Sequence, residues 1–455
     1  MSNSVSFKVI NRLAIPSILA GIIEPVISIT DTAIIGHIKE FPTESLAAVG
    51  IVGSFMSALF WILGQTKNAV STIISQKVGA SKLQKIYTLV PQILGLNVIF
   101  GLFLVFVTYF LAEDIFRLYS AKDKILELSI EYYKIRAFGL IFTLITFTLF
   151  GIFRGLQNTF WAMMISLTGG LINIVLDFVL VYGIDGFVSP MGIKGAAWAS
   201  LIAQFTMMLL AISFYAKKTP FGFRIYFDFH PEIPRFFLLT YNLIIRTIAL
   251  NFAIYLSNRF ATSYGKEYIA AHVIATNIWL FTAFFIDGYA DAGNSLAGKL
   301  SGAKDFANLK KLAHKLIRYG FWVASGLTLV FLVFKPYLGK MFTSDPIVLQ
   351  RFYEIYWLLI LILYSESIAF IFDGIFKGLG WVKFLRNMQL VTTLFVFIPS
   401  LLLMDYLGLK LWGIWVTYNI WMISRAGALW VEFSKNLRKY SLKKKYKSLD
   451  TDMLT

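Results

Sequence analysis

Carboxyl groups recur inside apolar stretches of this 455-residue chain, where a lone charge is unfavourable. One stretch carries Asp31, and a later one carries Asn173 and Asp177, which are four positions apart and so on one face of a helix. A carboxylate there can bind and release a proton, or hold a sodium ion with the Asn173 amide and a hydroxyl such as Ser200. The alternative is a structural hydrogen bond between helices. We expect cation coupling at Asp31, Asn173, Asp177 and Ser200.

A second group of charged residues lies in the later apolar stretches: Arg246, Asp287, Asp291, Glu366 and Asp373. One base among four acids suggests a buried ion-pair network. A structural clamp that holds three helices together is at least as compatible with these residues as ion coupling is.

Pro25 lies in the first apolar stretch, beside Glu24 and less than two helical turns before Asp31. Proline removes a backbone hydrogen bond and can bend a helix. We therefore expect a hinge at Pro25, next to the carboxylate that would sense protonation.

The sequence lacks the motifs of several other chemistries. It has no cysteine, which excludes disulfides and thiolate metal sites, and its four histidines are widely scattered. No Walker A, GxSxG or HExxH pattern occurs. We expect no cofactor, no catalytic residue and no metal apart from a coupling Na+ at Asp31, Asn173 and Asp177, so the chain is predicted to be a secondary transporter and not an enzyme.

The composition places these residues in a membrane. Hydrophobic residues make up 58% of the chain and charged residues 15%, with a mean hydropathy of +0.70. A soluble chain has about 25% charged residues and could not bury so much apolar surface. Since a spanning helix needs about 20 residues, the apolar runs predict twelve spans. They cover roughly 9–36, 46–76, 87–111, 127–153, 158–183, 195–216, 236–262, 269–297, 316–334, 352–376, 384–404 and 411–434.

The longest polar link divides these spans into two equal sets. We expect an N-terminal six-helix lobe over 1–216, a cytoplasmic linker over 217–235, a C-terminal six-helix lobe over 236–434 and a basic cytoplasmic tail over 435–455. Lysines 443 to 445 and 447 of that tail are expected to lie on anionic lipid headgroups.

Short matches recur between the halves at an offset of 223 residues. They pair Leu46–Ala48 with Ile269–Ala271, Val78–Lys82 with Ser301–Asp305, and Gly151–Leu156 with Gly374–Leu379. Three matches at one offset indicate two homologous halves, and an even number of spans keeps the halves in one orientation. The expected fold class is an all-α polytopic membrane protein with twelve transmembrane helices in two pseudo-symmetric six-helix bundles. Such a pair commonly makes a transporter with its substrate between the halves.

Basic residues are more numerous on one side of the membrane in the predicted arrangement of spans. The 42 Lys and Arg against 25 Asp and Glu give a net charge of +17, which could suggest a nucleic-acid partner. However, 26 of the basic residues lie on the side of the two termini and 8 on the other. This asymmetry predicts a multi-pass protein of the cytoplasmic membrane with both termini in the cytoplasm. The expected partner is the lipid bilayer, and no nucleic acid is expected.

Several segments resemble the MATE (multidrug and toxic compound extrusion) transporters, especially their DinF-like branch. The resemblance covers residues 8 to 435. It is carried by Pro16, Ile29–His37, Leu46–Gly50, Gln76–Ala80, Phe153–Gln157, Leu171–Asp177, Gly195–Ser200, Ile245–Thr247, Ile286–Ala290 and Phe372–Phe376.

The resemblance implies an antiporter that exports small organic, often cationic, compounds in exchange for H+ or Na+ by alternating access. It also implies that Asp31, Asn173 and Asp177 carry the coupling, with Ser200 where relatives often have a hydroxyl. Glu24 departs from the family pattern, and so does Lys299, where relatives often have Gln. We expect a monomer.

Two other classes of protein stay open at this point. A flippase for lipid-linked or polyprenyl precursors, of a related two-lobed fold, would favour a basic cavity, whereas buried carboxylates outnumber buried bases here. An intramembrane transferase would need acidic metal-binding motifs at the membrane surface, and the acidic pairs of this chain lie within spans.

Overall fold

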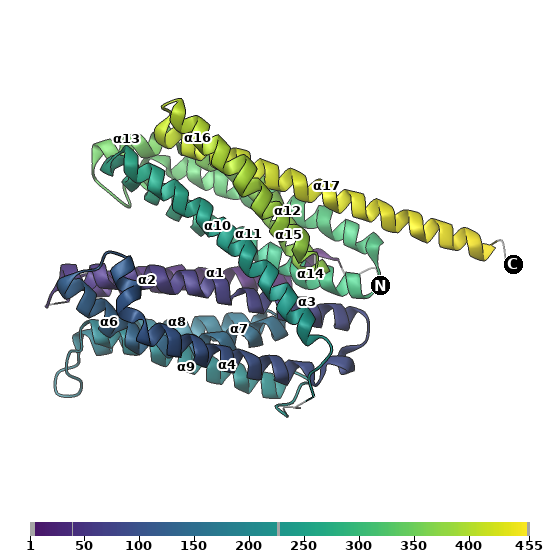
Figure 1. Ribbon diagram of the computed structural model, residues 1–455, viewed down its shortest axis with the longest axis horizontal. Coiled ribbons are helices and arrows are strands. Elements are labelled where there is room, and N and C mark those ends of the chain that lie inside the picture. The colour runs from purple at the N-terminus through teal and green to yellow at the C-terminus, as the bar shows by residue number, and fades with distance from the viewer. Residues whose placement is uncertain (1–4, 39, 225–227, 453–455) are drawn as a thin grey trace. The chain divides into compact units, whose positions relative to one another are not determined.

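The computed structural model describes residues 5–38, 40–224 and 228–452, with side chains described as far as residue 438. In this part of the chain the strand pairing is limited to one isolated bridge between Ile184 and Val188. The remaining elements are helices (Figure 1). They are α1 (Phe7–Ile35), α2 (Pro42–Leu63), α3 (Gln65–Gly79), η1 (Leu83–Ile86), α4 (Leu89–Phe110), α5 (Ala112–Leu118), α6 (Asp123–Ala137), α7 (Gly139–Gly155), α8 (Phe160–Tyr182), α9 (Ile193–Lys218), α10 (Ile233–Tyr264), α11 (Lys266–Gly302), α12 (Phe306–Leu338), α13 (Pro346–Glu354), α14 (Tyr356–Leu379), α15 (Val382–Thr392), η2 (Thr393–Phe397), α16 (Ile398–Tyr406) and α17 (Lys410–Asp452).

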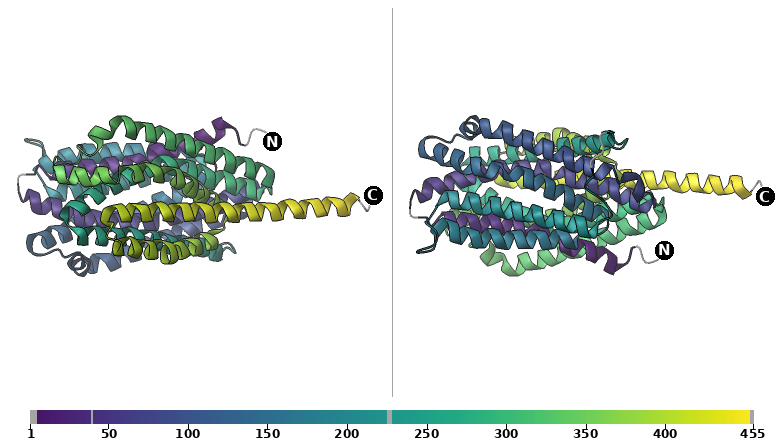
Figure 2. Two further views of the ribbon diagram at one scale, coloured as in Figure 1. Left: turned by 90° about the horizontal axis from the view of Figure 1, so that it is seen from above. Right: turned by 90° about the horizontal axis from the view of Figure 1, so that it is seen from below.

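The predicted all-α membrane fold is confirmed. Ten helical spans of the described residues are long and apolar enough to cross a bilayer, and the bent pair α6 and α7 makes eleven. The twelfth expected span, 411–434, lies in α17, which is one continuous long helix (Figure 2). Asn419, Arg425 and several Trp residues make this helix less apolar than the others. The lysines expected on lipid headgroups, 443 to 445 and 447, lie outside the described side chains.

The chain divides into two compact units. The N-terminal unit comprises Leu19–Lys77 and Lys82–Thr240, and the C-terminal unit comprises Met1–Ile18, Val78–Ser81 and Tyr241–Thr455. This division differs from the expected one at both boundaries. The start of the chain belongs to the C-terminal unit, and the link after α9 belongs to the N-terminal unit.

Specific hydrogen bonds explain both differences. At the start of the chain, the Tyr289 hydroxyl donates to the Asn11 Oδ1 atom at 2.9 Å within the C-terminal unit. In the link, the Gln92 Nε2 atom donates to the carbonyl oxygen of Asp228 at 2.7 Å, and the backbone N–H of His230 donates to Gln92 Oε1 at 3.0 Å. The expected boundaries of the two lobes were drawn from hydropathy alone, and hydropathy does not predict such side-chain contacts.

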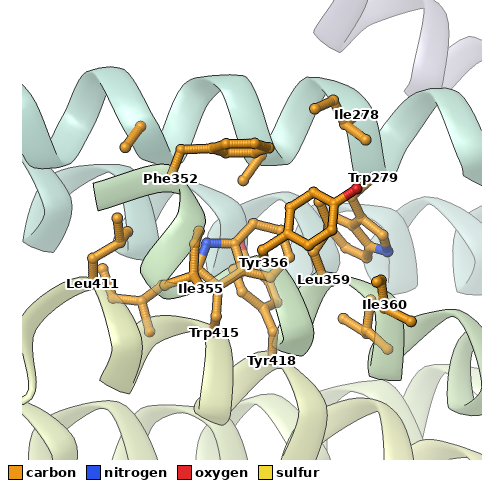
Figure 3. Close-up of a cluster of buried hydrophobic side chains, with 14 of the residues drawn as sticks. Ile278, Trp279, Phe352, Ile355, Tyr356, Leu359, Ile360, Leu411, Trp415 and Tyr418 are labelled. Carbon is orange, nitrogen blue, oxygen red and sulfur yellow. The ribbon is translucent and has the colours of Figure 1, made fainter. Parts of the chain in front are cut away.

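Each unit is a helix bundle with its own core. In the N-terminal unit, α9 packs against α6, α7 and α8, and α4 packs against α7. In the C-terminal unit, α14 packs against α11, α12 and α17. Large aromatic side chains fill the core of the C-terminal unit, where Trp279 of α11, Tyr356 of α14, and Trp415 and Tyr418 of α17 lie together (Figure 3).

The repeat seen in the sequence reappears as a repeated helix contact. Gly151 of α7 lies against the backbone of Lys67 in α3, and a Cβ atom there would overlap the Lys67 carbonyl oxygen. In the C-terminal unit, Gly374 of α14 lies in the same way against the carbonyl of Ala290 in α11. Gly374 lies 223 residues after Gly151, and Ala290 lies 223 residues after Lys67, so the two contacts correspond at the offset of the sequence repeat. Small residues at such crossings let helix backbones approach closely within a membrane.

Candidate functional site

The predicted ion-binding residues come together inside the N-terminal unit. Asp31 lies near the end of α1, Asn173 and Asp177 lie on one face of α8, and Ser200 lies on α9. All four side chains are buried, and Asp177 has no exposed surface. Three helices that are far apart in the sequence therefore contribute polar groups to one buried cluster, which we call the ion site.

Local structure brings α1, α8 and α9 together. Gly183, with φ of 77°, ends α8 and starts the short loop into α9. Gly195 of α9 then approaches the Leu180 carbonyl so closely that a Cβ atom would overlap it. The Tyr182 hydroxyl donates to the carbonyl oxygen of Ile34 at 2.8 Å, which fixes the end of α8 to the end of α1.

The carboxyl groups of Asp31 and Asp177 are close enough to influence each other's ionisation. Both oxygens of Asp177 and one oxygen of Asp31 are buried and accept no hydrogen bond from a donor in the described residues. Two ionised carboxylates at this separation repel each other, so the pair needs a proton or a cation between them. The chemistry that fits this arrangement is reversible uptake of a cation.

Two residues that were not predicted complete the ion site. Tyr132 and Arg136 lie on α6, four positions apart and on one face. The Arg136 Nη1 atom donates to the Tyr132 hydroxyl at 2.9 Å and to the Ser200 hydroxyl at 3.0 Å. The Asn173 Nδ2 atom also donates to the Ser200 hydroxyl, at 3.3 Å. The charge of Arg136 acts on both carboxyl groups.

The expected hinge lies close to the ion site along α1. The helix continues through Pro25 without a break. Because proline has no N–H, the carbonyl of Gly21 has no hydrogen bond from position 25. Glu24, beside this proline, is exposed in the N-terminal unit, unlike the buried Asp31. The two acids of α1 therefore have different surroundings.

The charged residues predicted for the second half meet in the C-terminal unit. The Arg246 Nη2 atom of α10 lies 2.7 Å from Asp373 Oδ1 of α14, and both side chains are buried. The Lys377 Nζ atom lies 2.6 Å from the other Asp373 oxygen, four positions further along α14. Asp373 thus bridges two cations, and we call these three residues the Asp373 clamp.

The other predicted acids of this unit lie around that clamp. Glu366 is fully buried and accepts a hydrogen bond of 2.9 Å from the Trp279 Nε1 atom. Asp287 is exposed in this unit and Asp291 is partly buried, although both belong to the same electrostatic cluster. Arg425 of α17 was not predicted, and it is fully buried with its guanidinium 5.1 Å from the centre of the Trp421 ring.

A further cluster ties the link after α9 to α3. The Lys77 Nζ atom lies 2.6 Å from one Glu232 oxygen, and the Arg235 Nη1 atom lies 3.1 Å from the other. Arg235 also donates to the Gln76 side chain. Burial alone would raise the pKa of the Glu232 carboxyl, but the hydrogen bonds from its two cationic partners outweigh burial and hold that pKa below its usual value.

The repeat between the two halves includes the close helix contacts but not the acidic residues of the ion site. At the 223-residue offset, the positions that correspond to Asp31 and Asp177 are Ile254 and Ser400. In the described part of the chain, no group of three or more His, Asp or Glu residues is arranged to hold a metal ion. The positions in the C-terminal unit that correspond to Asp31 and Asp177 therefore carry no carboxyl group.

The sequence is similar to those of known membrane proteins over nearly its whole length. The chain is 24% identical over 439 residues to the DNA damage-inducible protein F of Escherichia coli K12, which covers 95% of this chain and 93% of that protein. It is 25% identical over 426 residues to the probable multidrug resistance protein NorM of Bacillus cereus, covering 91% and 92% of the two chains.

Solved structures agree with the sequence comparison. An outward-facing multidrug resistance MATE family transporter superposes with a TM-score of 0.84 at 22% identity, over 95% of this chain and 96% of that one. A transporter of the MOP superfamily from Pyrococcus furiosus gives 0.85 at 21% identity, over 95% and 96%. The MatE family profile matches residues 16–179 and 243–402. The predicted resemblance is confirmed, and the chain belongs to the MatE family.

Proposed function

We propose that this protein is a cation-coupled antiporter that exports organic, predominantly cationic, compounds across the cytoplasmic membrane by alternating access. The observation that carries the proposal is the buried carboxyl pair of Asp31 and Asp177, which lies on two helices and needs a proton or a cation between its members. A carboxyl pair inside a membrane protein is costly to bury, which favours a functional role for it.

The relatives support the substrate class. NorM of Bacillus cereus is named as a probable multidrug resistance protein, and the outward-facing neighbour is described as a multidrug resistance transporter. Export of several unrelated organic compounds requires an energy source, and this sequence has no ATP-binding motif. An ion gradient, either of H+ or of Na+, is the source that the ion site can use.

In the mechanism we propose, the bound cation changes which conformation is stable. With a cation between Asp31 and Asp177, the two carboxyl groups attract each other through it, and α1 stays against α8. Without it, the two carboxylates repel, and α1 moves away with Pro25 as its hinge. The cation drives transport only to the extent that its affinity differs between the two conformations.

The Asp373 clamp has a structural role in this proposal. Both Asp373 oxygens are occupied by cationic partners at 2.7 and 2.6 Å, so that no oxygen of this carboxylate is free for a transported ion. The clamp holds α10 against α14, whereas ion coupling resides in the N-terminal unit.

Flux measurements in liposomes test the proposal. Purified protein would be reconstituted and the movement of ethidium followed under an imposed pH gradient, an imposed Na+ gradient, or no gradient. We expect at least one gradient to drive ethidium flux, and Asp31→Asn to abolish that flux. Asp185→Asn is the matched control, because Asp185 is exposed in the loop after α8. Full gradient-driven flux in Asp31→Asn, or no flux in the wild type, would contradict the proposal.

A further inference from the structure

The N-terminal unit carries an apolar groove that takes no part in the ion site. The groove has a volume of about 520 Å³, which is within the usual range for ligand pockets. It is lined by α4 between Leu102 and Phe110, and by Phe138 at the junction of α6 and α7. Because α4 belongs to a segment that is long and apolar enough to cross a bilayer, the groove lies at the depth of the acyl chains.

Aromatic rings form the walls of this groove. Phe106 and Phe110 pack edge to face with their ring centres 5.0 Å apart, and the Tyr109 ring lies 6.0 Å from that of Phe138. Phe106 is nevertheless 65% exposed and Phe110 is 69% exposed. From Leu102 to Phe110 the groove extends about 12 Å along α4, at the rise of an α-helix. A long, apolar and exposed groove at this depth suits a hydrocarbon chain.

A lysine lies at one end of the groove. The Lys134 Nζ atom of α6 is 5.2 Å from the centre of the Tyr109 ring. Tyr109 is the second-last residue of α4, and tyrosine is enriched where the hydrocarbon of a membrane meets the headgroups. The ammonium group of Lys134 therefore lies at the level of the lipid phosphates, whereas the rest of the groove extends toward the middle of the bilayer.

The charge of Lys134 is not neutralised by an acid of the protein. Among the described residues, no carboxylate lies within ion-pair distance of Lys134, and the two acids that precede it on α6 pair with other lysines. Glu127 lies 2.9 Å from Lys124, and Glu131 lies 2.5 Å from Lys194. An anion that binds at Lys134 must therefore come from outside the chain.

The same charge decides between possible occupants of the groove. An ammonium group at the rim repels a cationic compound and attracts a phosphate. The groove is also separate from the ion site. Arg136 lies two positions after Lys134 and so on a different face of α6, where it donates to Ser200.

We propose that this groove and Lys134 form a binding site for one anionic phospholipid. One acyl chain lies along α4 between Leu102 and Phe110, and the phosphate contacts the ammonium group of Lys134. A basic side chain at the level of the headgroups contributes to the affinity for anionic lipids. The site is the same whichever ion drives transport.

Native mass spectrometry of the full chain, released from detergent micelles, tests the proposal. The protein would be incubated with phosphatidylglycerol or with phosphatidylcholine that carries the same acyl chains. We expect the wild type to bind one phosphatidylglycerol about fivefold more tightly than phosphatidylcholine, and Lys134→Gln to lose this preference. Lys122→Gln is the matched control, because it removes the same charge from an exposed position at the start of α6 that does not line the groove.

A second variant tests the contribution of the acyl chain. Leu102→Trp places a larger side chain in the groove, and we expect it to weaken the binding of both lipids. In the wild type, sn-glycerol 3-phosphate should not displace the bound lipid, because it has the charge of the headgroup but no acyl chain. Gel filtration and circular dichroism would show that each variant is folded.

Several results would overturn the inference. They are equal binding of the two lipids by the wild type, an unchanged lipid preference in Lys134→Gln, and a loss of that preference in Lys122→Gln as large as in Lys134→Gln. Unchanged lipid binding by a folded Leu102→Trp variant, or displacement of phosphatidylglycerol by ethidium or by sn-glycerol 3-phosphate, would also contradict it. If Lys134→Gln does not fold, the wild type and Leu102→Trp decide.

Discussion

Removal of Asp373 should destabilise the C-terminal unit strongly. The Asp373 side chain is 4% exposed and pairs with Arg246, which is 8% exposed, at 2.7 Å, and with Lys377 at 2.6 Å. Asp373→Leu leaves two cations without their partner. Removal of one member of a buried ion pair costs about 3–5 kcal/mol, because the remaining charge stays buried and uncompensated. For a unit of about 200 residues, this loss lowers the melting temperature by on the order of 10 °C.

A surface pair of similar geometry provides the control. Arg351 Nη1 lies 2.8 Å from Glu354 Oε1, but these side chains are 31% and 39% exposed. Exposed pairs contribute about 0–1 kcal/mol, so Glu354→Gln should change the melting temperature by only a few degrees. Thermal unfolding of the purified protein, followed by intrinsic Trp fluorescence, compares the two variants directly.

A double variant tests the cause of the effect. Replacement of Arg246 together with Asp373 by leucine removes both charges of the more buried pair, and we expect it to recover a large part of the lost stability. Lys377 would remain, but it is less buried, at 16% exposed. The reasoning is refuted if Asp373→Leu melts no lower than Glu354→Gln, or if the double variant is destabilised by the sum of its two single changes.

Three further predictions concern other parts of the chain. Gly151→Leu and Gly374→Leu should each lower the yield of folded protein and its melting temperature, because the added side chain would overlap the backbone of the neighbouring helix; a melting temperature equal to that of the wild type would contradict this. Glu232 should stabilise the fold at neutral pH and lose this effect as the pH falls through its lowered pKa, below the ordinary 4.5, since a depressed carboxyl pKa stabilises only while the group is ionised. The melting-temperature difference between wild type and Glu232→Gln should therefore shrink on acidification. A difference that grows on acidification would contradict this prediction. Since the chain has no cysteine, single cysteines at Lys82 and Asp185, both exposed, should react with an impermeant maleimide from opposite sides of the membrane, Asp185→Cys from outside. Labelling of both from the same side would contradict the expected topology.

Much of the scaffold could be predicted because hydropathy and repetition report on it directly. Apolar runs locate helices in a bilayer, since every backbone polar group there must be satisfied within the helix. The match of Gly151–Leu156 with Gly374–Leu379 already indicated two related units, and both glycines occupy the same close helix contact. The unit boundary within α1 could not be found in this way, because hydropathy is continuous across Ile18 and the division depends on side-chain packing.

The acidic residues of the ion site could be found in the sequence by the same reasoning, but its basic residue, Arg136, could not. A carboxylate within an apolar run, such as Asp31 or Asp177, stands out because burial of its charge is costly. Arg136 lies close to the end of α6, where a long basic side chain ordinarily extends to the membrane surface and attracts no attention. The spacing of Tyr132 and Arg136, four positions apart, was the available signal.

Proton release on substrate binding tests the central claim most directly. Ethidium would be added to concentrated, weakly buffered, detergent-solubilised protein in the absence of Na+, and the bulk pH would be recorded. If the carboxyl pair of Asp31 and Asp177 is the exchange site, the wild type acidifies the solution when ethidium binds, and the Asp31→Asn, Asp177→Asn double variant does not. The account is contradicted if the wild type binds ethidium without releasing a proton, or if the double variant releases as many protons as the wild type.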